Sequence, residues 1–590
     1  MINELSRQPV TIVEMDPDYC SLNYGESPCT AAIGVTGSQK CFNTYRTCQD
    51  YDNYNNEPQT LRFVIPTRHS LIHGLNLLPF LDSVSIAPTR INVAGVDKNS
   101  TPLGKRESVT ITMIDRPYND NLVDKYYQER NYDPIKMGTF WGKWIARNPF
   151  YQGRPIRILN GFIGQPVSDY DVRHYIIETV STPDSNGRVK IVANDILKLA
   201  DGDKAKFPQA VNAKLETDLA ETQTSFAIIG KFEDFENPND IATLNHIKLS
   251  DELMEVVSKN KVTDDKFTIT VKRGVLGTEK QSHSLGDEVF RSYRLDGYAW
   301  HIVSWLLVNI AGVDQSYIDL TEWDKEALDW ISIYNVGTML TESEDVNVLI
   351  GELCQQCLFY IWWDASAKKV KLRAMHPALE EPKDINDNSG IIAGSFSETI
   401  KDKDRLSQVW VYYNKFSLIE DNDKKSNYSR VQARIDAEAE GDNQYKEKRI
   451  TEIFSRWLST EAQALNTGTR MLLRFRTPPR VATFELDLKD RDTQTGDVID
   501  LSSRGITDEF GIPIKKRMEV ISSQRKDDKI KIECQLYDYA GDTNKRFAYV
   551  MPDGSPDYKD ATPEQIKARG WWISDANGKM SDGSEGWRII

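Results

Sequence analysis

The residues best suited to chemistry are four closely spaced cysteines near the start of the chain. Cys20, Cys29, Cys41 and Cys48 are four of only seven cysteines among 590 residues. The surrounding segment, about 16 to 56, is rich in Tyr, Gly, Asn, Asp, Ser and Thr and has almost no Leu, Ile or Val. Such a segment cannot bury a core of its own. We therefore expect its cysteines to cross-link it.

Three kinds of cross-link are open to these thiols. Two disulfides would allow three connectivities, but no secretory signal precedes them, so we expect a reducing cytoplasm, which disfavours disulfides. Structural zinc sites normally use C-x₂₋₄-C knuckles, because one tight turn presents two thiolates to one tetrahedral ion. Here the gaps are C-x₈-C, C-x₁₁-C and C-x₆-C. Iron–sulfur clusters accept wider gaps, because each thiolate binds a different iron, so the spacing favours such a cluster over zinc.

The other candidate motifs indicate ordinary structure. Cys354 and Cys357 form a C-x-x-C pair, but they fall inside a predicted helix, so we expect buried residues without redox function. His69 and His73 have helical i, i+4 spacing but lack the Glu of an H-E-x-x-H motif. Gly274 to Lys280 lacks the spacing of a phosphate-binding loop and predicts a turn.

No motif of a known catalytic centre is present. The sequence has no G-x-S-x-G elbow, no signature of a cysteine nucleophile and no dinucleotide-binding glycine fingerprint. Aromatic pairs such as Trp362-Trp363 and Trp571-Trp572 suit a core or a protein interface as well as a sugar or a base. We therefore expect a protein that is not an enzyme.

The composition is that of a folded protein without a strong affinity for nucleic acid. Hydrophobic residues make up 39% and charged residues 27% of the chain. Its 73 basic and 88 acidic residues give a net charge of −15, which argues against binding nucleic acid mainly through phosphate charge. The most apolar stretch, Ala299 to Val313, is too short to span a bilayer, so no membrane-spanning segment is expected.

Strand patterns dominate, which predicts a mainly β, α+β fold with helical insertions in several domains. Thr341 to Glu344 has the T-x-x-E spacing of a capping box, so we expect a helix that begins there and leads into a hairpin. A second helix is predicted from about Thr460 to Leu473. The predicted domains are a cysteine-rich segment (1–59), a first β-rich domain (60–208), a small β-module (209–295), a helical and hairpin domain (296–393), a second β-rich domain (394–545) and an extended C-terminal arm (546–590).

The cysteine-rich segment resembles that of a known family. The matching runs are Asp18-Tyr19-Cys20, Tyr24-Gly25, Pro28-Cys29-Thr30-Ala31, Lys40-Cys41-Phe42-Asn43-Thr44 and Thr47-Cys48-Gln49-Asp50. They are similar to the four-cysteine segment in tail-tip proteins of long-tailed, lambda-like bacteriophages (siphoviruses) and gene transfer agents. The resemblance implies a 4Fe-4S cluster with Cys20, Cys29, Cys41 and Cys48 as its metal ligands.

Scattered matches extend the resemblance to the central baseplate hub of such tails. Arg273 to Thr278, His283 and Gly286-Asp287 look like the RGxxGT…H…GD module of phage tail proteins. Cys357 to Leu372 looks like a strand pair of the hubs, and Gly496-Asp497-Val498 like the strand start of their second barrel. One departure is that this cysteine segment stands at the front of a long chain, whereas in lambda it closes a shorter one.

A hub of this family would be a structural virion protein at the phage tail tip, assembled in the host cytoplasm. The resemblance implies a homotrimer whose subunits each contribute two β-barrel-like ring domains. Its partners would be the distal tail protein ring, a central tail fibre and the tape-measure protein, with phage DNA only in transit. Two alternatives are an iron–sulfur electron-transfer enzyme, which would need a second cofactor site or a partner-binding face, and a tail-associated cell-wall hydrolase. The sequence shows no motif for either.

Overall fold

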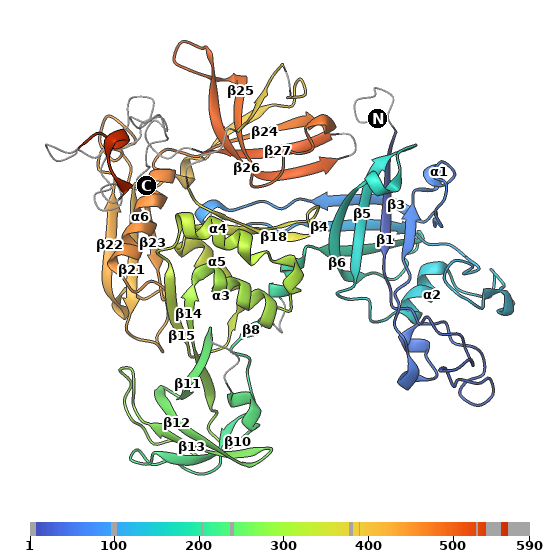
Figure 1. Ribbon diagram of the computed structural model, residues 1–590, viewed down its shortest axis with the longest axis horizontal. Coiled ribbons are helices and arrows are strands. Elements are labelled where there is room, and N and C mark those ends of the chain that lie inside the picture. The colour runs from blue at the N-terminus through green and yellow to red at the C-terminus, as the bar shows by residue number, and fades with distance from the viewer. Residues whose placement is uncertain are drawn as a thin grey trace.

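The structure is a set of β-sheets grouped around a small helical centre (Figure 1). The computed structural model describes residues 8–95, 103–201, 205–236, 241–376, 382–388, 390–526, 529–537 and 556–563. The predicted mainly β class with helical insertions is confirmed. Most of the predicted C-terminal arm, 546–590, lies outside the described residues. In the part of the chain that is described, no helix is long and apolar enough to cross a membrane.

The first sheet has seven strands in the order β2-β1-β5-β6-β7-β4-β3. The strands are β1 (Pro9–Met15), β2 (Leu61–Val64), β3 (Leu81–Ala87), β4 (Ser108–Ile114), β5 (Pro155–Phe162), β6 (Asp171–Val180) and β7 (Arg188–Asn194). Its two edges meet, because the Val64 N–H donates to the Leu78 carbonyl (3.0 Å) and the Leu78 N–H donates to the Arg62 carbonyl (2.8 Å). Leu78 lies just before β3, so this sheet closes into a barrel, called here the first barrel.

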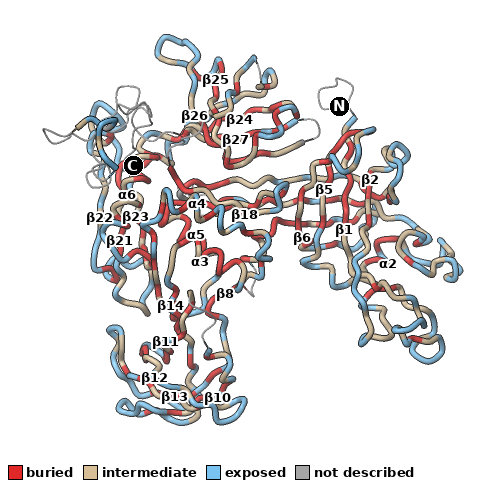
Figure 2. The backbone as a smooth tube through the Cα atoms, viewed as in Figure 1, coloured by how far each residue is buried: buried red, intermediate tan, exposed pale blue. Residues whose placement is uncertain are grey.

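The interior of the first barrel follows the period-two pattern of its strands. Val109, Ile111 and Met113 of β4 are fully buried, while the residues between them face outward. The helix α2 (Phe140–Arg147) covers one end of the barrel with Phe140 and Trp141, and α1 (Pro66–His69) is a single turn. Figure 2 shows the alternation along β6, where buried stretches alternate with intermediate ones.

A second seven-stranded sheet contains the predicted small module. Its order is β15-β14-β11-β12-β13-β10-β9. The strands are β9 (Lys214–Leu215), β10 (Ser225–Ile229), β11 (Ala242–Leu249), β12 (Glu252–Thr263), β13 (Lys266–Lys272), β14 (Phe290–Tyr298) and β15 (Asn335–Leu340). Since β14 pairs with β15, the sheet extends past residue 295 into the helical centre, and the two share one core.

The helical centre packs three helices beside the predicted hairpin. Its elements are α3 (Ala299–Trp305), a π-helical turn (Leu306–Ile310), α4 (Leu320–Trp330), α5 (Val346–Gln356), β17 (Phe359–Asp364) and β18 (Lys369–Ala374). The apolar stretch from Ala299 is therefore a buried core helix, whose Trp300, Ile302 and Val303 are fully buried.

The predicted capping box at the start of α5 is wrong. The helix begins only at Val346, because Glu344 lies in β16 (Glu344–Asp345), which pairs with β8 (Lys206–Phe207). The Glu344 carboxylate instead forms an ion pair with Arg456 at 2.8 Å. The Thr341 hydroxyl donates to the Leu418 carbonyl at 3.3 Å. Both side chains of the motif are therefore bonded to residues elsewhere in the fold, and neither caps the helix.

The last third of the chain forms a second barrel-like sheet and a small helix-backed sheet. The six-stranded sheet has the order β19-β25-β26-β27-β24-β20, and the smaller sheet β22-β21-β23 packs on α6. Their elements are β19 (Lys383–Asn386), β20 (Ser397–Ile400), β21 (Gln408–Lys415), β22 (Tyr428–Ile435), β23 (Ile450–Phe454), α6 (Glu461–Phe475), β24 (Arg480–Asp487), β25 (Val498–Thr507), β26 (Pro513–Lys526) and β27 (Lys529–Leu536).

The six-stranded sheet is curled. Its two edge strands, β19 and β20, follow each other closely in the chain, so the two edges of the sheet lie near each other. β19 pairs with β25 at one edge. Only a few residues later the Ile392 N–H donates to the Glu485 carbonyl of β24 at 2.9 Å, at the other edge. We call this sheet the second barrel. Before β25, Gly496 has a φ of +93°, and a Cβ there would lie 2.4 Å from the Trp362 ring, so glycine lets the hairpin pack directly against the barrel.

The two barrels touch each other directly. The Ile91 N–H donates to the Ile521 carbonyl at 2.9 Å, and Arg90 pairs with Glu533 at 3.0 Å. Figure 1 shows the first barrel extending toward β26 and β27 above the helical centre. A hydrogen bond and an ion pair thus join the two barrels of the chain.

Candidate metal centre

The cysteine segment, residues 16–60, is an insertion within the first barrel. It connects β1 to β2, and β1 pairs with both β2 and β5. The first barrel therefore begins at Pro9, ahead of the cysteines. The predicted boundary between residues 59 and 60 places the start of this domain too late in the chain. Inside the segment only two short 3₁₀ turns form, at Tyr45–Thr47 and Tyr51–Asn53. In Figure 1 the segment is the dark blue chain that projects below β1.

The structure brings all four predicted cysteines to one cavity. Cys20, Cys29, Cys41 and Cys48 line a hollow of about 350 Å³ that is partly open to solvent. All four are free thiols; Cys20 is buried and the other three are partly exposed. Residues spread over almost thirty positions of the chain thus line one cavity.

The thiols act on each other electrostatically. Burial raises the pKa of Cys41 and of Cys48, and the neighbouring thiols raise both pKa values further. Backbone N–H groups oppose this: the Asp50 N–H donates to Cys48 Sγ at 3.4 Å, and that of Asn43 lowers the pKa of Cys41. The balance of these effects raises both pKa values and so favours the neutral thiols, although Arg130 also lowers the pKa of Cys41.

The spacing of the thiols does not suit a single ion. In the described ranges, no three or more His, Cys, Asp or Glu side chains are placed to hold one metal ion together. A tetrahedral zinc site would need its ligands within about 2.3 Å of one point. An iron–sulfur cluster would instead bind each thiolate at a separate iron.

A second insertion holds the cysteine segment in place. Residues 115–154, which connect β4 to β5 and include α2, lie against it; we call them the brace. The Tyr24 N–H donates to the Tyr126 hydroxyl at 2.6 Å, and Lys125 Nζ donates to the Ser21 carbonyl at 2.6 Å. The segment therefore has support besides any cross-link between its cysteines, which sequence reasoning missed.

Arg130 makes the densest set of contacts in the brace. Its guanidinium donates to the carbonyls of Lys40 and Cys41 at 2.8 and 2.7 Å and pairs with the buried Asp124 at 2.8 Å. Its Cζ also lies 4.1 Å from the centroid of the Phe42 ring. Asp124 fixes the guanidinium, and the guanidinium fixes the main chain beside Cys41. The helix α2 lies within residues 115–154. No sequence pattern there predicts the contacts of Arg130.

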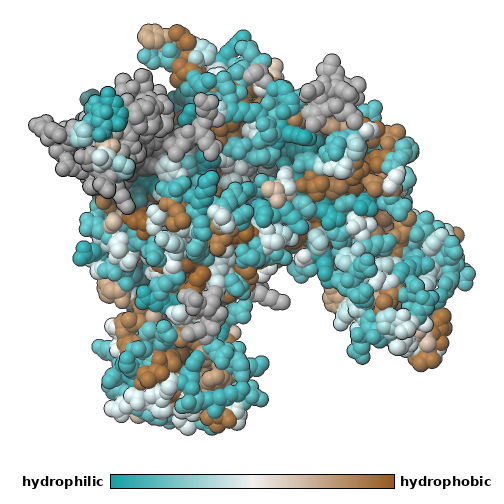
Figure 3. All heavy atoms as spheres, viewed as in Figure 1, coloured by the Kyte–Doolittle hydropathy of each residue, from teal (hydrophilic) through white to brown (hydrophobic). Residues whose placement is uncertain are grey.

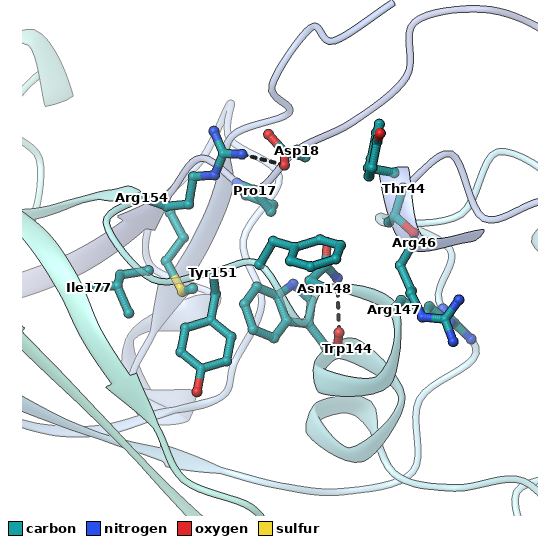
Figure 4. A pocket seen from close by; sticks show the side chains of 13 residues that line it. Pro17, Asp18, Thr44, Arg46, Trp144, Arg147, Asn148, Tyr151, Arg154 and Ile177 are labelled. Carbon is teal, nitrogen blue, oxygen red and sulfur yellow. Dashed lines mark hydrogen bonds and ion pairs between the residues drawn. The ribbon is translucent and has the colours of Figure 1, made fainter. Parts of the chain in front are cut away.

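A second cavity separates the cysteine segment from α2 (Figure 4). It encloses about 360 Å³, partly open to solvent, between rings that include Tyr45, Trp144 and Phe150. The ion pair of Asp18 and Arg154, at 2.5 Å, closes one side and anchors the start of the segment to the barrel. This cavity contains none of the cysteines.

Cys354 and Cys357 are buried, as predicted. Cys354 lies in α5 and Cys357 caps its C-terminal end, and their exposures are 2% and 0%. Burial raises the pKa of both thiols, so neither is a reactive thiolate. His69 also has a local role, since its Nε2 lies 3.2 Å from the Leu77 carbonyl oxygen.

The RGxxGT…H…GD residues form a buried ionic network around an acid that the sequence did not single out. Arg273 binds Glu252 through two hydrogen bonds of 2.7 Å, and His283 Nε2 lies 2.9 Å from the same carboxylate. The N–H groups of Gly274 and Gln281 also donate to it, at 2.9 and 3.1 Å. The network closes the turn after β13, so its role is structural.

Comparison with known proteins gives similarity in structure only. No protein-family model matches the chain, and no curated protein does either. Among solved structures, a 43 kDa tail protein of prophage MuSo2 from Shewanella oneidensis is 8% identical, with a TM-score of 0.34 over 78% of this chain and 98% of that one. A tail protein from Neisseria meningitidis MC58 is 10% identical, with a TM-score of 0.34 over 77% and 97%. A chain of a native gene transfer agent virion is 12% identical, with a TM-score of 0.32 over 55% and 84%. These neighbours are phage tail and virion proteins, but similarity at this level does not establish a shared fold.

Proposed function

We propose that this protein is a structural component of a phage virion, the central hub of the tail tip. In this role it closes the tail tube and connects the distal tail protein ring to a central tail fibre. The observation that carries the proposal is the direct contact of two barrels within one chain, through Ile91 with Ile521 and Arg90 with Glu533.

A homotrimer in which each chain has two barrels can match the symmetry of a sixfold tail tube. Three chains supply six barrels, so a threefold ring can approximate the sixfold symmetry of the tail above it. Cyclic closure also protects sheet edges that would otherwise be open to unwanted pairing. The contact between the barrels is rigid enough for this role because it combines a backbone hydrogen bond with ion pairs, among them Arg525 with Asp171 at 3.2 Å.

The charge of the chain suits a channel through which DNA passes. With a net charge of −15, the ring would repel phosphate and let phage DNA and the tape-measure protein slide without sticking. No catalytic role is part of the proposal.

We further assign a 4Fe-4S cluster to Cys20, Cys29, Cys41 and Cys48, in a structural role. The cavity that all four thiols line and the N–H groups directed at Cys41 and Cys48 support it. When bound, the cluster would supply the positive charge that four crowded thiolates lack.

The far end of the cysteine segment and its brace offers a contact surface. Ile33, Val35 and Ile135 are 58%, 82% and 93% exposed, and Figure 3 shows apolar areas at the free end of this part of the molecule. Exposed apolar side chains on a projecting part of a molecule can contact another protein. In the hub, that protein would be the central fibre.

A cryo-EM reconstruction of the virion tip tests the proposal. We expect three copies in one ring, with six barrels around the channel and the cysteine segment directed away from the tube. Six copies of the chain, or one copy at the end of a fibre, would contradict it. The purified protein incubated with peptidoglycan provides a second test, since release of soluble fragments would favour the hydrolase.

A further inference from the structure

The hydroxyl of Tyr54 is a buried hydrogen-bond donor without a partner among the described residues. A phenol ordinarily keeps its proton near neutral pH and can donate it. Leaving such a group unpaired in the interior is unfavourable, because it loses its hydrogen bond to water and gains none in the protein. An orphaned donor of this kind calls for an acceptor that the protein chain itself does not provide.

Tyr54 lines the same cavity as the four cysteines. Its hydroxyl interacts electrostatically with Asp18, Cys20 and Cys48. Asp18 is already held by Arg154 at 2.5 Å. No hydrogen bond joins the Tyr54 hydroxyl to Asp18 or to a cysteine sulfur among the described residues, so its acceptor is a group that binds in the cavity.

The position of Tyr54 is fixed from both sides. Its N–H donates to the Tyr51 carbonyl at 3.2 Å, which closes the second 3₁₀ turn. Its ring meets that of Tyr45 edge-on, with 5.2 Å between centroids. The hydroxyl thus reaches the cavity from a ring held by packing.

Another unpaired atom on the wall of the cavity does not satisfy it. Asn43 Oδ1 also lacks a partner among the described residues, but no hydrogen bond joins it to Tyr54. The Asn43 amide is oriented by its Nδ2, which donates to the Cys20 and Leu22 carbonyls at 3.0 and 3.1 Å. It cannot turn toward Tyr54 without losing both bonds.

We infer that the Tyr54 hydroxyl donates a hydrogen bond to a sulfide of the bound cluster. Tyr54 is thus a positioning residue that tunes the cluster. This inference rests on the cluster assigned above. Hydrogen bonds to sulfur set the reduction potential of such clusters, because they favour the reduced state, which carries one more negative charge.

Replacing Tyr54 with phenylalanine removes the donor and keeps the ring. We expect Tyr54→Phe, reconstituted anaerobically with ferrous iron and sulfide, to bind as much iron as wild type. Its midpoint potential in a dithionite titration should become more negative, with the equilibrium constant for reduction about tenfold lower, or about 59 mV for one electron. The matched control is Tyr51→Phe, whose ring is 52% exposed and does not line the cavity, and it should leave the potential unchanged.

The outcomes separate this inference from the cluster itself. A wild-type protein that takes up no iron and sulfide refutes the cluster and with it the inference. A loaded Tyr54→Phe variant with an unchanged potential refutes only the role of Tyr54. If Tyr54→Phe does not load, 3-fluorotyrosine at position 54, a stronger donor of similar shape, must raise the potential in mildly acidic buffer, and an unchanged value there overturns the inference.

Discussion

Cys41→Ser should give a colourless protein when it is purified without oxygen, whereas the wild-type protein should be brown. Among the proposed ligands, Cys41 is the one whose carbonyl accepts a hydrogen bond from Arg130, at 2.7 Å. Serine keeps the shape of the site but is a poor ligand for iron, which prefers thiolate. Iron and sulfide analysis should show a fall from about four of each per chain to a small fraction.

The double variant Cys354→Ala with Cys357→Ala is the matched control. Those two thiols are buried in and beside α5, so their loss should leave the colour, the iron content and the assembly of the protein unchanged. Loss of infectivity with intact folding would contradict their inert role. Stoichiometric zinc without iron in the wild-type protein would refute the cluster but leave the cross-link standing.

The grouping of the four cysteines could be predicted from the sequence, but the support of the segment could not. A stretch with almost no Leu, Ile or Val needs another means of cohesion, and four cysteines supply one. The brace comes from residues 115–154, about a hundred positions away. In its key contacts, Lys125 and Arg130 donate to main-chain carbonyls and the Tyr126 hydroxyl accepts from a main-chain N–H, and such contacts leave no periodic pattern.

Two similar motifs show how tertiary contacts decide a helix start. Thr460 caps α6 with its hydroxyl, and Gln463 completes a capping box, so the predicted second helix is confirmed with its boundary. Thr341 and Glu344 have the same spacing, yet the helix begins later, at Val346. Arg456 lies within reach of Glu344, and an ion pair outweighs the modest gain of a cap.

The strands could be predicted from alternation, whereas the closure of the barrels could not. The fully buried Val109, Ile111 and Met113 alternate with outward-facing residues, which the sequence displays. Closure of the first barrel depends on Leu78, an isolated residue between strands that pairs with β2. It also depends on β1, which precedes the cysteines in the chain and lies inside the predicted cysteine-rich segment (1–59).

Arg273→Met should strongly destabilise the second seven-stranded sheet. The side chains of Arg273 and Glu252 are 1% and 0% exposed, and removing Arg273 leaves the Glu252 charge buried with only His283 and two backbone N–H groups as partners. The expected cost is about 3–5 kcal/mol of local stability. Hydrogen exchange of the amides in β12 and β13 measures it directly, which suits a chain with several domains that need not unfold together.

Lys272→Met is the matched control for Arg273→Met. Lys272 is the neighbouring residue of β13, is 65% exposed and pairs with the partly exposed Glu255. A surface pair of this kind contributes about 0–1 kcal/mol, so amide exchange in the sheet should change little. Equal protection in the two variants would show that the buried pair adds nothing to the stability of the sheet.

The same network should make the sheet sensitive to acid. Burial alone would raise the pKa of Glu252, but hydrogen bonds from Arg273 and His283 outweigh it, so this pKa lies below its ordinary value of 4.5. A carboxyl whose pKa is lowered in the folded state stabilises the fold fully above the ordinary pKa, and this contribution is lost as the pH falls through the lowered value. Exchange of β12 and β13 should therefore accelerate as the pH falls below about 4.5, after correction for the intrinsic exchange rate. Glu252→Gln should be less stable near neutral pH and should lose this step, because the amide does not titrate, whereas Glu255→Gln on the exposed face should retain it.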